Sequence, residues 1–139
     1  MSYQIVVPDE PSAGQRQAIV DPLSGFNAQH GFPPDSRTVA VLLNDDDGVV
    51  VGGLWGKTGY GWLFVEFLAV PEKLRGQSLG AQLMAEAERI AIERGCVGAW
   101  LTTFSFQAQG FYEKLGYSAF ARLEDSPHGN DRIFLRKRF

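Results

Sequence analysis

The chain has 139 residues, of which 45% are hydrophobic and 21% charged, and its formal net charge is −3. These values are typical of one globular domain with a genuine apolar core, so we expect a single domain over residues 1–139. The negative charge argues against nucleic acid or an anionic membrane surface as a partner, and no apolar run is long enough to cross a bilayer.

Cysteine and histidine are too scarce for a disulfide framework or a recognisable zinc site. Cys96 is the only cysteine, which favours a reducing, cytoplasmic location. His30 and His128 stand in Gly/Pro-rich surroundings, and the spacing of these three residues matches no zinc cluster. We therefore expect no bound metal.

The first 36 residues are predicted to contain one strand and one or two short helices. The apolar run at residues 3–7 favours a strand that ends at Pro8, and Ser12 can cap a helix over residues 11–20. Pro22 and Gly25 are expected to break that helix and to leave a weaker helical segment after it, over residues 23–29.

The rest of the chain mixes apolar strands with amphipathic helices. The clearest helix covers residues 78–94, where apolar residues recur at helical spacing and Glu88 belongs to the polar side. A second helix is expected over residues 107–115. Strands are predicted over residues 37–44, 48–56, 61–70, 97–103, 117–123 and 132–138. This order indicates a mixed α/β sheet in which the strands 61–70 and 97–103 are parallel and joined by a helical crossover.

The turn at residues 75–80 has a composition suited to phosphate. It follows an apolar strand and precedes the clearest helix, whose first backbone N–H groups have no partner within the helix. Gly76 and Gly80 would let a ligand approach the backbone closely, and Arg75 adds a positive charge. The turn matches neither a Walker loop nor a dinucleotide-binding loop. On these residues alone, a purely geometric role for the glycines stays open.

Two separated motifs resemble the GNAT superfamily of N-acetyltransferases. Residues 68–84, LAVPEKLRGQSLGAQLM, resemble its motif A, and residues 106–117, FQAQGFYEKLGY, resemble its second motif. The resemblance implies a single-domain α/β fold with a mixed central sheet of about six to seven strands. It further implies helices on both faces of the sheet and a splayed strand pair that forms the acyl-CoA cleft.

The resemblance implies acetyl-CoA as the co-substrate and an amine as the acceptor. It assigns the pyrophosphate to the turn and the pantetheine arm to the strand before it. The two departures from the motifs are Ser78, where a glycine is usual, and Ser105, where an asparagine is frequent. The residues implied in acyl-CoA binding are Leu68, Ala69, Val70, Arg75, Gly76, Gln77, Ser78, Leu79, Gly80 and Ser105.

Two residues are candidates for proton transfer. Tyr112 matches the tyrosine that many members of this superfamily use as the acid for the departing thiolate, although a packing role beside Phe111 is the alternative. Glu66 is a candidate base; strict alternation would place it on one strand face with Trp62, Phe64, Leu68 and Val70, although a bulge could shift this register. A carboxylate paired with an arginine or aimed at solvent is its alternative role.

The acceptor leaves no chemical signature in the sequence. Trp55 and Phe104 are aromatic candidates for the lining of its pocket, and a core role is their alternative. Phe26 and Asn27 are expected to form a wall over the acceptor, on the placement that the resemblance implies. Three hypotheses stand: an N-acetyltransferase for a small molecule or peptide, an acyltransferase with another donor or acceptor, and a non-catalytic acyl-CoA-binding module. A homodimer is compatible with each.

Overall fold

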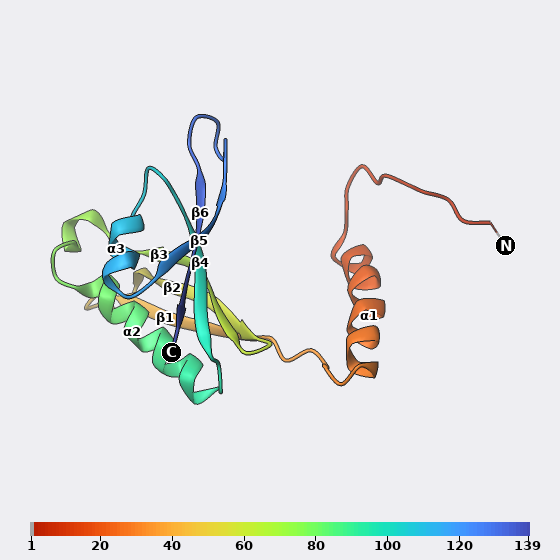
Figure 1. Cartoon of the computed structure of the whole chain (residues 1–139), viewed down its shortest axis with the longest axis horizontal. Coiled ribbons are helices and arrows are strands. Elements are labelled where there is room, and N and C mark those ends of the chain that lie inside the picture. Colours follow the sequence, from red (N-terminus) through yellow and green to blue (C-terminus); the bar gives the residue numbers. More distant parts are fainter. Residues whose placement is uncertain (1) are drawn as a thin grey trace. The chain divides into compact units, whose positions relative to one another are not determined.

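The computed structural model describes residues 2–139 and divides into two compact units, one that ends at Pro34 and one from Asp35 to Phe139 (Figure 1). None of the described helices is long and apolar enough to cross a membrane. The described residues also bring no three metal-ligating side chains together.

The N-terminal unit contains a single helix, α1 (Ala13–Gln29). Its start is fixed by a capping box in which Ser12 and Gln15 each bond the other's backbone N–H. The helix continues through Pro22, so the predicted break after residue 20 is wrong. The predicted strand at residues 3–7 is also wrong, because the structure gives this segment neither a helix nor a strand partner.

The C-terminal unit is built on one open sheet of six strands, in the order β1-β2-β3-β4-β6-β5. Neighbouring strands are antiparallel except for β3 and β4, which are parallel as predicted. The α/β fold class with a mixed sheet is therefore confirmed. The strands are β1 (Arg37–Asn44), β2 (Val50–Gly59), β3 (Trp62–Ala69), β4 (Gly98–Phe104), β5 (Ser118–Leu123) and β6 (Arg132–Arg138).

Two helices, α2 (Leu79–Glu93) and α3 (Gln109–Lys114), share one apolar core with this sheet (Figure 1). Leu83, Met84, Ala87 and Ala91 of α2 are buried against the sheet, as the helical periodicity predicts. Phe111, Tyr112 and Leu115 pack against the same core. Both helices of this unit therefore lie on one face, and the expected second helical layer is not part of it.

Glu88 is an exception to the helical pattern. Its carboxylate accepts a hydrogen bond from the Tyr117 hydroxyl at 3.0 Å and pairs with Lys137 Nζ at 2.7 Å. Its side chain is only 12% exposed, so the assignment of Glu88 to the solvent side is wrong. The partners come from the end of the chain, which explains why local periodicity could not reveal them.

Candidate active site

The sheet opens between its two parallel strands. β3 and β4 are paired from Trp62–Gly98 to Val65–Leu101 and no further. Beyond that point β3 continues to Ala69 beside β2, while β4 continues to Phe104 beside β6. The facing edges of the two strands are left without strand partners, which is the splay expected of an acyl-CoA cleft.

A β-bulge in β3 coincides with the point of separation. Trp55 lies opposite Phe67 and the next residue, Gly56, lies opposite Val65, so Glu66 is the additional residue. A bulge bends its strand and increases the local twist, which directs β3 away from β4. It also shifts the alternation: Leu68 and Val70 pack against the core, on the side of Leu63 and Val65. The predicted grouping of Leu68 and Val70 with Trp62 and Phe64 is therefore wrong.

The turn after β3 presents a row of unpaired backbone donors. A short 3₁₀ helix (Glu72–Leu74) leads into it, and no acceptor in the described part of the chain receives the N–H groups of residues 76–81. The Arg75 side chain is exposed and forms no ion pair with any described carboxylate. N–H groups at the positive end of a helix dipole, with one arginine beside them, favour a phosphate ligand.

Ser78 occupies the strained position of this turn. It is the N-cap residue of α2 with φ 61° and ψ 18°, in the left-handed region, and its side chain makes no capping hydrogen bond. Outside glycine, this conformation costs about 1 kcal/mol because Cβ crowds the following carbonyl. The departure from glycine at this motif position therefore leaves Ser78 in a strained backbone conformation.

The two glycines of the turn have different roles. Gly76 has φ +83° and an added Cβ would meet no atom within 4 Å, so this residue shapes an open turn. At Gly80, an added Cβ would lie 3.1 Å from the Phe111 ring. Gly80 thus lets α2 and α3 approach each other, and a substitution there would disturb packing as well as any ligand.

Tyr112 lies on α3, close to the start of α2. The Phe111 contact with Gly80 joins these helices, and the Tyr112 ring meets the Phe111 ring edge-on with 5.0 Å between centroids. Burial raises the pKa of the Tyr112 phenol above its ordinary value, so the group is protonated at neutral pH. Its hydroxyl has no hydrogen-bond partner among the described residues and is available to a ligand.

Glu66 is half-buried at the bulge, at the mouth of the splay. Its carboxylate has no hydrogen bond or ion pair within the described residues. The paired-arginine alternative is therefore not realised in this structure. An unpaired carboxylate at this place can accept a proton from an incoming group.

The other candidate residues are placed less uniformly. The Ser105 hydroxyl accepts from Asp131 N at 3.1 Å and bonds Asn130 Oδ1 at 3.3 Å, so it is already engaged by the loop before β6. Trp55 is 48% exposed on β2, and Phe104 stacks on Phe106 beyond the end of β4. Phe26 and Asn27 belong to α1, in the other unit.

One residue that the sequence analysis left out holds the connection between β4 and α3. Gln107 Oε1 accepts hydrogen bonds from Phe104 N at 2.8 Å and from the buried Thr103 hydroxyl at 3.2 Å. These bonds fix the turn that carries Tyr112. The sequence feature that could have revealed this role is a glutamine three residues after the end of a strand. At this separation the side chain can accept a hydrogen bond from the backbone N–H at the strand end.

The chain belongs to the Acetyltransferase (GNAT) family, whose model matches residues 3–117. Acetyltransferase Atu2258 of Agrobacterium fabrum is 38% identical over 134 residues, 96% of this chain and 98% of that protein. Blasticidin-S acetyltransferase of Streptomyces morookaense is 43% identical over 91 residues, 65% of this chain and 67% of that protein. The chain is accordingly an acyltransferase.

Solved structures share the fold. A crystal structure of an Agrobacterium tumefaciens protein, 38% identical, has a TM-score of 0.90 and covers 99% of this chain and 100% of its own. An aminoglycoside 6'-N-acetyltransferase complexed with coenzyme A, 20% identical, has a TM-score of 0.65 over 73% of this chain and 72% of its own.

Replacing Ser78 by glycine should stabilise the protein. Glycine adopts the left-handed conformation without the Cβ penalty, and the substitution removes no hydrogen bond because the Ser78 side chain makes no capping bond. We expect Ser78→Gly to raise the free energy of unfolding by up to about 0.5 kcal/mol, since glycine's greater freedom in the unfolded chain offsets much of the relieved strain. Urea denaturation measures this change; a destabilised Ser78→Gly protein would show that the hydroxyl stabilises the turn.

Proposed function

We propose that this protein transfers the acetyl group of acetyl-CoA directly to an amine of a small molecule or a peptide. The single observation that carries the proposal is the separation of β3 and β4 after Val65 and Leu101, with a turn of unpaired N–H groups after the end of β3. Family membership and the coenzyme A complex of a protein with the same fold support acetyl-CoA as the donor.

The donor would bind along an extended path. Leu68, Ala69 and Val70 offer backbone groups on the edge of β3 that faces away from β2, and a pantetheine amide chain can pair with them as an added strand would. The pyrophosphate would then reach the N–H groups of residues 76–81, with Arg75 beside it. A backbone N–H at the splay would also polarise the thioester carbonyl as an amine attacks.

Two side chains would manage the protons. Glu66 would accept a proton from the acceptor's ammonium group, so that the neutral amine can form the new C–N bond. Tyr112 would give its phenolic proton to the coenzyme A sulfur as the C–S bond breaks. Since the pKa of Tyr112 is raised, its acid form persists across neutral pH, and loss of activity through its ionisation is expected only above about pH 10.

The donor site is tested by a matched pair of charge removals. Arg75 and Lys73 are both exposed cations at this turn, but only Arg75 stands directly before the N–H groups. Arg75→Ala should weaken acetyl-CoA binding about tenfold, as expected for loss of one charge-assisted contact, while Lys73→Ala should change it little. Calorimetry measures both. Equal effects of the two substitutions would mean a general charge effect and no defined phosphate contact.

Tyr112→Phe should lower the single-turnover rate by roughly 10² or more, because the proton donor is removed while the ring stays packed. Release of the coenzyme A thiol, followed over an amine panel, identifies an acceptor for this measurement. Tyr117→Phe is the control, since the Tyr117 hydroxyl donates its hydrogen bond to Glu88. We expect this variant to lose about 1 kcal/mol of unfolding free energy and to keep a single-turnover rate within about twofold of the parent. A Tyr112→Phe protein that reacts at the parental rate would assign the residue to packing.

Glu66→Gln should flatten the acidic limb of the rate–pH profile and lower turnover more than acetyl-CoA affinity. The amide keeps the shape of the side chain and removes its ability to take a proton. Steady-state kinetics from pH 5 to 9 with the acceptor in excess measure both effects. An unchanged limb would point to a route in which the amine loses its proton to water.

A further inference from the structure

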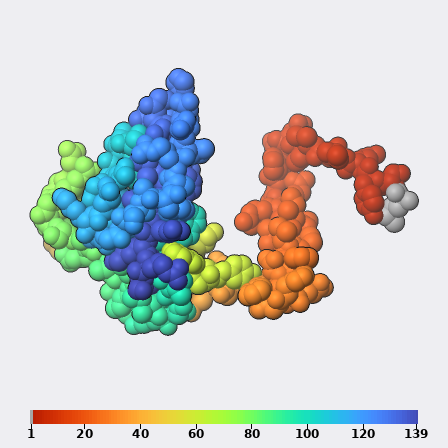
Figure 2. Space-filling model, viewed as in Figure 1, coloured from red at the N-terminus to blue at the C-terminus, as the bar shows by residue number. Residues whose placement is uncertain are grey.

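The N-terminal unit exposes most of its apolar side chains. α1 has no buried residue, and its side chains Ile19, Leu23 and Phe26 are 67%, 60% and 59% exposed. Their spacing of four and three residues places them in one stripe along the helix. Before α1, the segment 3–7 exposes Tyr3, Ile5, Val6 and Val7 in the same way. This segment belongs to the red end of the chain in Figure 2. We call residues 3–29 the arm.

The sequence of α1 does not support a helix on its own. It contains Gly14, Gly25 and an internal Pro22, which cost about 1, 1 and 3 kcal/mol relative to alanine. Its first turn has no acidic residue and its last turn no basic one, so the dipole adds nothing. A helix of 17 residues with this composition needs a surface to pack on.

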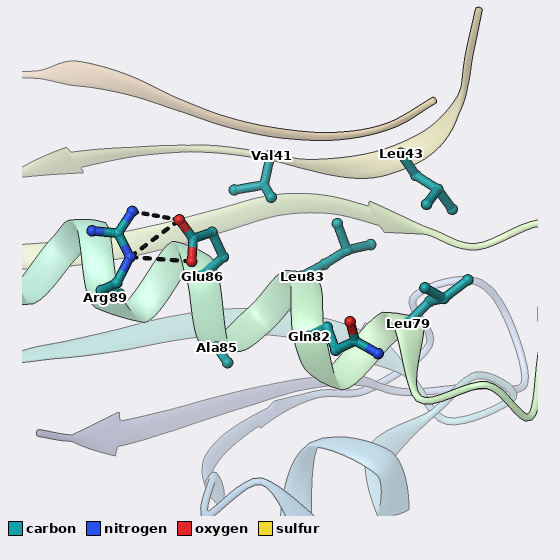
Figure 3. A pocket seen from close by; sticks show the side chains of 8 residues that line it. All are labelled: Val41, Leu43, Leu79, Gln82, Leu83, Ala85, Glu86 and Arg89. Carbon is teal, nitrogen blue, oxygen red and sulfur yellow. Dashed lines mark hydrogen bonds and ion pairs between the residues drawn. The ribbon is translucent and has the colours of Figure 1, made fainter. Parts of the chain in front are cut away.

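The C-terminal unit has an open sheet edge with a groove beneath it. Within residues 35–139, β1 pairs only with β2, and its outer edge has no strand beside it. Between this edge and α2 lies a groove of about 550 Å³ whose apolar lining is Val41, Leu43, Leu79, Leu83 and Ala85 (Figure 3). An added strand would satisfy the free edge and place alternate side chains in this groove.

The same unit has an uncovered apolar face. Ala40 is paired with Trp55, and Trp55 with Phe67, so the three lie in a row across β1, β2 and β3. Trp55 and Phe67 are 48% and 69% exposed, and Leu42 on the same face of β1 is 52% exposed. This face is opposite to the one that carries α2. Val39 and Leu54 directly precede Ala40 and Trp55 in their strands and are buried in the core, and successive side chains of a strand point to opposite faces.

The connector between arm and sheet is stiff. Pro33 and Pro34 hold an extended backbone, and each restricts the residue before it to extended conformations. Asp35 is fixed to the β2–β3 turn, where its carboxylate accepts a hydrogen bond from Tyr60 N at 3.0 Å. Two consecutive prolines form a semi-rigid spacer, which disfavours a tight reversal of the chain between Phe32 and Asp35.

We propose that two copies of this chain exchange their arms. Residues 3–7 of one copy add a strand to the outer edge of β1 in the other, over the groove beside α2. The α1 stripe of Ile19, Leu23 and Phe26 packs on the partner's row of Ala40, Trp55 and Phe67. The exchange covers the α1 stripe, the row of Ala40, Trp55 and Phe67 and the groove beside α2, and it supplies the packing surface that α1 lacks.

The first test measures the oligomeric state of the full chain and of two lysine variants. Leu23→Lys charges the stripe, whereas Ala28→Lys places the same charge on the opposite side of α1. By analytical ultracentrifugation we expect a dimer for the parent and for Ala28→Lys, and a monomer for Leu23→Lys. Near-UV circular dichroism establishes that the sheet unit stays folded in each variant, and Ile19→Lys repeats the test. A parent that is monomeric, or a dimer indifferent to both stripe variants, would overturn the proposal.

The second test separates exchange from an arm folded onto its own chain. Pro33→Gly with Pro34→Gly loosens the connector, so the arm can close onto its own sheet; we expect the dimer dissociation constant to rise about tenfold. Hydrogen exchange of the parent should show protection of residues 3–7 in the dimer that is lost on dilution to monomer. Protection that persists in the monomer, or a dissociation constant unchanged by the two glycines, would contradict exchange.

Discussion

β3 and β4 stay hydrogen-bonded for only four residue pairs, and the arrangement of the site depends on that short length. Each strand then remains with its other neighbour, so that β1-β2-β3 and β4-β6-β5 separate as two halves of one sheet. Backbone donors and acceptors on the facing edges must find partners elsewhere. A ligand with its own amides, lying between the halves, is the partner that this geometry suits, and the turn with unpaired N–H groups follows β3 after one short 3₁₀ helix.

The second constraint is the contact between α2 and α3 at Gly80 and Phe111. It connects the turn that would hold the phosphates with the short helix that carries Tyr112. Next to it, two tyrosines have different environments: Tyr117 is bound to Glu88, while the Tyr112 hydroxyl has no partner among the described residues. Burial raises the pKa of both phenols, and the nearby Glu88 carboxylate raises that of Tyr117 further. Of these two phenols, only that of Tyr112 is both protonated and available.

Local sequence patterns predicted most of the sheet and the long helix, because these depend on short-range periodicity. The strands at 37–44 and 132–138 have the predicted bounds, and α2 begins one residue after Ser78. The local patterns gave wrong predictions where contacts with residues far away in the sequence determine the structure. The bulge at Glu66 arises from the register with β2, and Glu88 is buried by Tyr117 and Lys137. The 3–7 segment has the composition of a strand, yet a strand forms only when it pairs with another strand. A local sequence pattern does not predict which strand that partner is. The site residues at the turn and on α3 came from motif resemblance, which periodicity alone would not have given.

The open edge in the splay and the open edge of β1 differ in what they permit. The first lies between two strands of the same molecule, β3 and β4, so a ligand that pairs there leaves no further edge open to another molecule. The second faces outward, and an arm donated to it leaves the donor's own edge still open. Reciprocal donation between two copies closes the assembly, whereas donation to a third copy extends it into a linear polymer. Because two consecutive prolines are semi-rigid, the Pro33–Pro34 segment would limit the directions that an arm can take. That range of directions would govern whether exchange ends in a closed pair or continues as a linear polymer.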